Sequence, residues 1–214
     1  MDSHMCEDGF VVINNCSMNN DTNTGKDFNI VDEYGAVGDG ETVNTAMIQA
    51  AIDDACKHYS ELLLCGKRGH DARVVVPSPG KFVTGTLYLK TGVELYLEDG
   101  ATRIGSTNRF DYHFGSRWMA LLMAENESDF KVTGASHFSL IIDGQGQQLA
   151  VNIDNLIHEG KIIDPEYTNR PNEKQRPQII EFINCRNITT SNIWMEPNIQ
   201  TVHRVEFTRC GRQQ

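Results

Sequence analysis

The sequence has no long hydrophobic run, which argues against a membrane-spanning protein of the helical type. Nothing in its 214 residues approaches the roughly 18 consecutive apolar residues of a membrane-spanning helix. The longest apolar stretches are short and β-branched, such as Val74-Val75-Val76. The opening residues, MDSHMCEDGF, also lack the basic and apolar regions of a secretory signal peptide. We therefore predict no membrane partner and no signal peptide, and the subcellular location stays open.

Positive charge is scarce as well. The chain has 19 Lys and Arg against 29 Asp and Glu, which gives a formal net charge of −10. A field of this sign repels the phosphate backbone, so we predict no nucleic-acid partner. Hydrophobic residues make up 39% and charged residues 22%, which is ordinary for a soluble globular chain. The length suits a single domain with a substantial core.

No two cysteines have C-x-x-C spacing, which removes the basis for a zinc or thioredoxin-like site. The even number of cysteines permits disulfides but does not require them, and buried thiols are equally compatible with a chain of this size. The six cysteines are Cys6, Cys16, Cys56, Cys65, Cys185 and Cys210.

The chain divides into a short lead-in and one domain. Residues 1–27 are predicted to be poorly ordered, because they are rich in Asn, Ser and Thr and have no apolar periodicity. Within them, residues 10–13 (FVVI) are the one stretch that can pair as a short strand. Residues 28–214 are predicted to form the domain.

A helix is predicted over residues 45–57. Ile48, Ala51, Ile52 and Ala55 recur at i, i+3, i+4 and i+7, which places them on one narrow face. These side chains are small, so we expect the helix to lie close against a flat surface. Asn44 or Thr45 is the expected N-cap.

After the helix the pattern becomes β and stays β. Short alternating segments are each followed within a few residues by a turn, and no Asn-Gly pair of the hairpin type occurs. A polar insertion between Gly146 and Arg176 interrupts the pattern and contains a possible short helix. The alternating apolar residues include Leu87, Leu89, Val93, Leu95 and Leu97.

A local repeat indicates how these strands are arranged. EFINC at Glu181 returns as EFTRC at Glu206, so Phe182 matches Phe207, and Cys185 matches Cys210. In a solenoid of parallel strands, like residues stack at the strand spacing of ~4.8 Å. Rungs of about 22 to 25 residues fit such repeats. The sequence therefore predicts a β-solenoid in which the stacked cysteines are packed thiols rather than a disulfide, with helix 45–57 covering the N-terminal end.

Four segments resemble, in order, parts of the pectin-degrading parallel β-helix proteins. IVDEYGAVGDGETVNTAMIQAAID is similar to their entry segment, and GTLYLKTGVELYLEDGATRIGS narrows the resemblance to glycoside hydrolase family 28, the polygalacturonases. IIDGQG and RPQIIEF follow in the order of the family. The resemblance implies an all-β fold: a right-handed parallel β-helix with an N-terminal capping α-helix, truncated at its C-terminal end.

The resemblance also implies hydrolysis of α-1,4-linked galacturonan, or related rhamnogalacturonan, with inversion, and it implies no metal and no organic cofactor. One carboxylic acid protonates the leaving oxygen, and carboxylates ~6.5–9.5 Å away activate a water. The family supplies these groups from an Asn-Thr-Asp segment and an Asp-Asp pair, followed by Gly-His-Gly and Arg-x-Lys. None of these motifs occurs here in a usable context. We therefore name no catalytic residue and expect the chain alone to be inactive.

Two short stretches come near these motifs without matching them. The only Asp-Asp pair, Asp53-Asp54, lies inside the predicted helix, where adjacent residues do not face each other. Gly69-His70-Asp71 lacks the second glycine and precedes the main strands. We therefore interpret Asp53-Asp54 as part of a solvated helix face, and Gly69-His70-Asp71 as a surface loop.

The candidate substrate-binding residues are His203 and Arg204. In PNIQTVHRVEF, His203 aligns with a histidine of the family, although Gln200 stands where a tryptophan is usual. Arg204 can pair with a uronate carboxylate. A strand-end histidine and a solvated arginine are the plain alternatives for these two positions.

The leading functional hypothesis is a polygalacturonase-like glycoside hydrolase whose partner is a pectic or related acidic polysaccharide. The alternatives are a non-catalytic module that binds such a polysaccharide and a structural β-helix. The net charge disfavours the first, and the order of the family segments disfavours the second. A coil that is open at its last rung is also expected to self-associate, because its backbone hydrogen-bonding groups are exposed.

Overall fold

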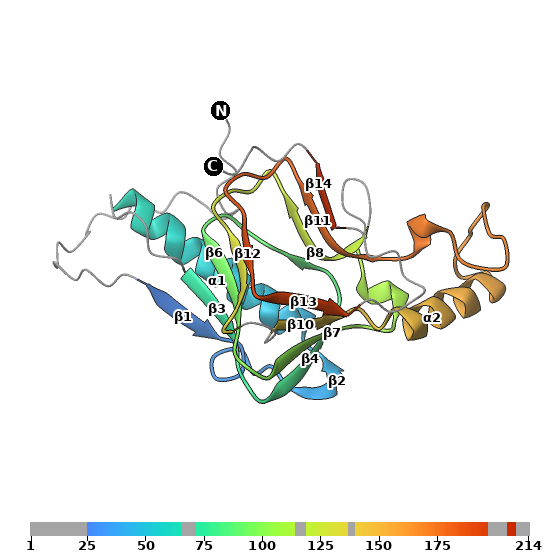
Figure 1. Ribbon diagram of the computed structural model, residues 1–214, viewed down its shortest axis with the longest axis horizontal. Coiled ribbons are helices and arrows are strands. Elements are labelled where there is room, and N and C mark those ends of the chain that lie inside the picture. Colours follow the sequence, from blue (N-terminus) through green and yellow to red (C-terminus); the bar gives the residue numbers. More distant parts are fainter. Residues whose placement is uncertain (1–24, 66–71, 114–118, 137–139, 197–204, 209–214) are drawn as a thin grey trace.

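The computed structural model describes residues 25–65, 72–113, 119–136, 140–196 and 205–208. Its strands form three parallel sheets (Figure 1). Sheet A contains β1 (Lys26–Asn29), β3 (Ala72–Val76), β6 (Val93–Leu97), β9 (Lys131–Gly134) and β12 (Thr189–Ser191). Sheet B contains β2 (Asp39–Val43), β4 (Gly80–Thr84), β7 (Ala101–Gly105), β10 (Leu140–Asp143) and β13 (Ile193–Glu196). Sheet C contains β5 (Leu87–Tyr88), β8 (Ala120–Glu125), β11 (Gln178–Ile183) and β14 (Val205–Thr208).

From β3 onward the chain visits the sheets in the fixed order A, B, C, and every strand pairs in parallel with its equivalent one rung away. This is a parallel β-helix, as the sequence predicted. The predicted stacking of the repeat is also confirmed at the backbone, because Glu181 pairs with Glu206 and Phe182 with Phe207. Cys185 is buried, and its predicted neighbour Cys210 lies outside the described residues.

The rungs differ in length more than the sequence predicted. Ala72 pairs with Val93 and Glu181 with Glu206, so these rungs close after 21 and 25 residues. Leu122 pairs with Leu87 below it and Ile180 above it, at separations of 35 and 58 residues. The extra length lies between sheets B and C, in the segments that connect β7 to β8 and β10 to β11.

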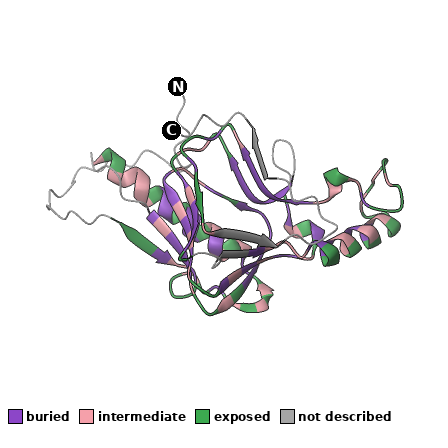
Figure 2. Ribbon diagram, viewed as in Figure 1, coloured by how far each residue is buried: buried purple, intermediate pink, exposed green. Residues whose placement is uncertain are grey.

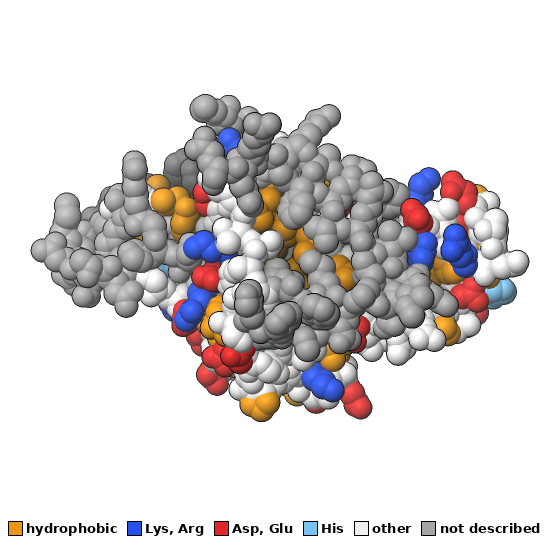
Figure 3. All heavy atoms as spheres, viewed as in Figure 1, with side chains coloured by type: hydrophobic (Ala, Val, Ile, Leu, Met, Phe, Trp, Pro, Cys, Tyr) orange, Lys and Arg blue, Asp and Glu red, His pale blue; other side chains and the backbone are white. Residues whose placement is uncertain are grey.

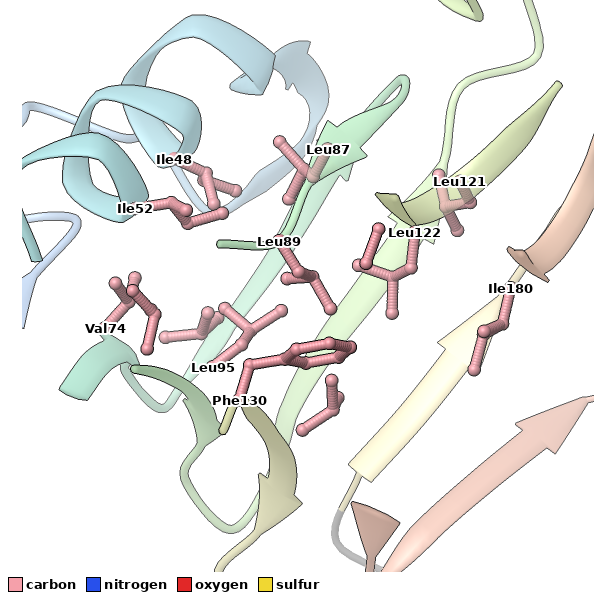
Figure 4. Packing of buried hydrophobic residues seen from close by; sticks show 14 of the residues in the cluster. Ile48, Ile52, Val74, Leu87, Leu89, Leu95, Leu121, Leu122, Phe130 and Ile180 are labelled. Atoms are coloured by element: carbon pink, nitrogen blue, oxygen red, sulfur yellow. The ribbon is translucent and has the colours of Figure 1, made fainter. Parts of the chain in front are cut away.

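The interior of the coil is apolar and closely packed (Figures 2 and 4). Val93, Leu95 and Leu97 are buried, and they alternate with half-buried residues as the pattern predicted. Phe130 and Phe182, on successive rungs, meet edge to face with their ring centroids 5.0 Å apart.

Helix α1 (Thr45–Leu64) closes the N-terminal end of the coil. It follows β2 and precedes β3, so it stands where the first rung would otherwise have a strand of sheet C. Ile48 and Ile52 point from the helix toward Val74 and Leu87 (Figure 4). The predicted capping helix is confirmed, and it continues seven residues beyond the predicted end at residue 57.

The predicted N-cap position of this helix is confirmed at Asn44, although its side chain bonds elsewhere. Asn44 occupies the N-cap position but makes no side-chain capping hydrogen bond. Its buried amide instead accepts from the Val37 N–H at 2.7 Å and donates to the Val37 and Thr42 carbonyls at 2.9 and 2.6 Å. The reason is that Asn44 is fully buried, where these backbone groups have no access to water. Thr45 accepts from the Gly85 N–H at 2.8 Å.

Asparagine and aspartate side chains link the turns between sheets C and A. The Asn184 amide donates to Asn126 at 2.6 Å, and the Asn187 amide donates to Asp129 at 2.8 Å. All four residues have positive φ, between 52° and 60°. Asn and Asp tolerate this left-handed conformation better than other residues with a Cβ, which is why they recur at the corner.

The insertion at residues 146–176, here called the arm, extends away from the coil (Figure 1). It contains α2 (Gly146–His158) and the short 3₁₀ helix η2 (Glu173–Gln175). Leu149, Ile153 and Leu156 of α2 are buried, so the predicted short helix is confirmed. The arm is fixed at a second 3₁₀ helix, η1 (Arg109–Asp111), where the Arg109 N–H donates to Asn152 Oδ1 and Arg109 Nε donates to the Gln175 carbonyl.

Candidate functional site

The outer face of sheet C is the candidate substrate surface, because the predicted binding residues His203 and Arg204 directly precede its strand β14. Ile180 and Phe182 belong to the interior, so Glu181 between them faces outward. Register places Glu181 in one row with Met123 and Tyr88. Tyr88 is half exposed, whereas the Glu181 carboxylate is fully buried.

The arm borders this face where the strands of sheet C begin. Leu121 and Ile179, the outward neighbours of Leu122 and Ile180, meet Leu149 of α2 around a cavity of about 10 Å³. Such a cavity holds about one water molecule, so the arm is packed against the coil rather than separated from it by a cleft. The arm therefore forms one wall beside sheet C.

The arm carries charges of both signs, as its end at the right of Figure 3 shows. Lys161 lies 2.8 Å from Glu159, and Lys174 lies 3.5 Å from Glu166. Arg176, where the arm rejoins the coil, has a pKa below its ordinary value, mainly because it is partly buried. The described part of the arm is thus electrostatically mixed, and no single-sign track for a polyanion is visible on it.

Arg103 lies inside the coil rather than on a surface. It is 1% exposed, and Nη2 donates to the Leu121 carbonyl at 3.3 Å. Among the described residues, Nε and Nη1 have no hydrogen-bond partner. Burial lowers the pKa of the Arg103 guanidinium to about 9, well below its ordinary value. An arginine facing the core cannot contact a polymer that lies on the outside of the coil.

The acids of the capping helix have separate partners, which agrees with their interpretation as a helix face. Lys90 Nζ lies 3.0 Å from Asp53, and the Tyr34 hydroxyl donates to Asp54 at 3.0 Å. Burial, and then the hydrogen bond to Asp54, raise the pKa of Tyr34 above its ordinary value. The two carboxylates do not converge on a common point.

The predicted substrate-binding residues, His203 and Arg204, lie outside the described residues and stay predictions. The same holds for Gly69-His70-Asp71. Within the ranges that the structure describes, no cluster of three or more His, Cys, Asp or Glu side chains is arranged to hold a metal. In those ranges, no helix is both long and apolar enough to cross a membrane.

Two residues of interest were not identified as such from the sequence. Glu181 served only as a marker of the repeat, although its alternation with Ile180 and Phe182 was the signal that it faces outward. Arg103 occupies an inward position between Ala101 and Gly105, and alternation alone would have placed it in the core. Both were missed because a single charged residue in a strand is usually solvated.

The architecture places the chain among the parallel β-helix proteins. A solved chain of this kind, the family 28 exopolygalacturonase of Yersinia enterocolitica, superimposes with a TM-score of 0.59 over 80% of this chain and 35% of its own length, at 21% identity. That likeness concerns the fold. No family model matches the chain.

Sequence similarity to characterised proteins is more specific. The exo-poly-alpha-D-galacturonosidase of Dickeya chrysanthemi is 44% identical over 82 residues, which are 38% of this chain and 11% of that protein. The polygalacturonase of Ralstonia solanacearum is 26% identical over 184 residues, covering 77% of this chain and 32% of its own. The chain is thus similar to polygalacturonases in sequence as well as in fold. It spans less than a third of the length of these two curated relatives.

Proposed function

We propose that this chain is part of a polygalacturonase that hydrolyses galacturonan or a related pectic polysaccharide. The supporting observation is the 44% identity to an exo-poly-alpha-D-galacturonosidase over 82 residues. The fold is consistent with this activity, because a parallel coil repeats outward positions at the strand spacing, and acids on neighbouring rungs then reach the separation that inversion requires.

We further propose that residues 1–214 do not hydrolyse the polymer by themselves. Inversion needs a general acid and a carboxylate that activates water, ~6.5–9.5 Å apart. The one Asp-Asp pair of the sequence is on α1, where each carboxylate has its own partner. In this proposal the chain provides the capped end of the scaffold and the arm beside sheet C, and His203 and Arg204 contact the sugar acid.

The inactivity is tested with a reducing-sugar assay on polygalacturonate and on rhamnogalacturonan. Purified 214-residue protein is expected to give the rate of the buffer blank. Clear turnover would overturn the proposal that the catalytic groups are missing.

The hydrolase assignment itself is tested by reading the gene beyond codon 214. An open frame that encodes Asn-Thr-Asp and Asp-Asp on the following rungs, and whose longer product cleaves polygalacturonate or rhamnogalacturonan, is the expected result. A stop codon at once, or a longer product with both motifs that cleaves neither polymer, would argue against it.

We also propose that the 214-residue protein associates through its last rung. Strands β12, β13 and β14 are the terminal strands of their three sheets in the described part of the chain, so one side of each offers backbone hydrogen-bonding groups. Light scattering is expected to show assemblies that grow with concentration. A monomer that persists at high concentration would contradict this association.

A further inference from the structure

Helix α1 and its C-cap carry two disulfide-bonded cysteines, Cys56 and Cys65, that are not bonded to each other. Nine residues of α-helix rise by about 13 Å, whereas the Cα atoms of a disulfide lie within ~7 Å. Nine residues also make about two and a half turns, so the two side chains leave the helix on opposite sides. Each cysteine therefore has a partner elsewhere.

The number of cysteines narrows the choice of partners. Cys185 is a buried thiol, and its Sγ donates to the Ile183 carbonyl at 3.2 Å. The sequence then leaves Cys6, Cys16 and Cys210, all outside the described residues. Two partners drawn from these three within one molecule must include at least one cysteine of residues 1–24.

A groove beside the helix is placed to receive that segment. It has a volume of about 380 Å³ and lies between β1 and α1, with Lys26 and Phe28 on one side and Asp54, His58 and Glu61 on the other. The positions 54, 58, 61 and 65 follow i, i+4, i+7 and i+11, so Cys65 continues the same stripe of the helix. Cys56 is 4% exposed and belongs to the opposite, core-facing side.

We propose that residues 1–24 occupy this groove and are held there by a disulfide between Cys65 and Cys6 or Cys16. Lys26 lines the groove, so the segment that precedes it starts there. The chain from Cys16 to Lys26 spans up to ~33 Å when extended, whereas His58 and Cys65 are only ~10 Å apart along the helix. Both candidate cysteines are therefore within reach.

This inference goes beyond the hydrolase proposal and does not depend on it. In this proposal the capping helix packs on the coil with the side that carries Cys56, and Cys65 ties its opposite side to residues 1–24. Such crosslinks form and persist in oxidising compartments, so the protein belongs to the class that folds outside a reducing cytosol. The cap is then the part of the coil whose stability depends on redox conditions.

Peptide mapping of the oxidised protein tests the pairing directly. After thiols are alkylated, trypsin places Cys65 on peptide 58–67, Cys6 and Cys16 on 1–26, Cys56 on 27–57, and Cys210 on 210–212. We expect 58–67 to be linked to 1–26 in a protein that runs as a monomer on a non-reducing gel. Linkage of 58–67 to 210–212, an alkylated Cys65, or a disulfide-linked dimer would overturn the proposal.

Thermal melting provides an independent readout. Cys65→Ser is expected to lower the melting temperature of the oxidised protein by about 5 °C or more, and to reduce the further loss caused by a reductant. Cys185→Ser is the matched control, because it changes a buried thiol but must leave the link between 58–67 and 1–26 intact. Equal melting of Cys65→Ser and wild type would show that this disulfide does not anchor the cap.

Discussion

Replacing Arg103 with methionine is expected to stabilise the protein, although a charged side chain with a hydrogen bond is removed. The guanidinium is 1% exposed, and no carboxylate is among the groups that shift its pKa. The lowering of the Arg103 pKa to about 9 corresponds to an unfavourable free energy on the order of 5 kcal/mol for burying the charge. Methionine is flexible enough to fill the same space in an apolar core.

The expected gain is smaller than this cost. The Leu121 carbonyl loses the 3.3 Å hydrogen bond from Nη2, at a penalty of about 1–3 kcal/mol. The net increase in the free energy of unfolding is then about 2–4 kcal/mol, in line with the replacement of other buried charges by apolar side chains. For a chain of this size the melting temperature should rise by roughly 5–10 °C.

Urea unfolding at neutral and alkaline pH measures this effect. Because burial lowers the pKa of Arg103 to about 9, the folded protein should release this proton at a lower pH than the unfolded chain does, so above pH 9 the unfolded state binds more protons. The penalty in the wild type therefore shrinks as pH rises from about 9, and the advantage of Arg103→Met should shrink with it. Below pH 9 the full advantage is present.

Arg103→Lys is the control, because it retains a buried positive charge and should bring no gain. The reasoning would be refuted if Arg103→Met lowered the free energy of unfolding by more than about 1 kcal/mol while Arg103→Lys left it unchanged. That result would mean that the positive charge is compensated in the folded protein.

Three further substitutions test other parts of the fold. Gly92→Ala should lower the free energy of unfolding, measured in urea, by about 2 kcal/mol or more, because the new Cβ would lie 2.1 Å from the Tyr59 ring. Gly160→Ala is the control: it is also at positive φ but has nothing within 4 Å, so it should cost about 1 kcal/mol. Equal losses for the two variants would contradict the steric argument. Tyr112→Phe should lose about 1 kcal/mol at pH 7, since the hydroxyl donates at 2.7 Å to a buried carbonyl. Burial raises the pKa of Tyr112, so above pH 10 the folded protein keeps this proton while the unfolded chain releases it. The free energy of unfolding of the wild type should therefore fall as the pH rises above 10. An identical fall in Tyr112→Phe would show that Tyr112 does not cause this pH dependence. Asn184→Ala should lower the free energy of unfolding by about 1–2 kcal/mol. Asn184→Gly should lower it less, because glycine adopts the left-handed turn easily although it lacks the amide. A larger loss for Asn184→Gly than for Asn184→Ala would show that the positive φ is not what requires asparagine here.

The repeating parts of the fold could be predicted because their signals are local and periodic. Leu95 and Leu97 alternate with half-buried residues, and Ile48 and Ile52 follow the helical period, so both patterns identify their element and its buried face. The repeat at Glu181 and Glu206 even gave the register of two strands. Each of these features needs only neighbours within about 25 residues.

Features that depend on distant neighbours could not be predicted in the same way. Asn44 was expected to cap a helix and does occupy the N-cap, but its amide binds backbone groups of the preceding loop, at Val37 and Thr42, rather than those of the helix. Arg103 looked like any strand arginine until the coil enclosed it. The length of the rung between β8 and β11 followed from the arm, whose position beside sheet C is set by packing between Leu149 and Ile179.

The sequence by itself therefore predicted a capped parallel β-helix that resembles the polygalacturonases, because periodicity and motif order can be read directly along the chain. Only the tertiary structure decided which face of sheet C is flanked by the arm, which charge is buried in the coil, and that the two cysteines of α1 point to opposite sides and need separate partners. These features depend on contacts between residues far apart in sequence, and such contacts stabilise the protein only once the coil has formed.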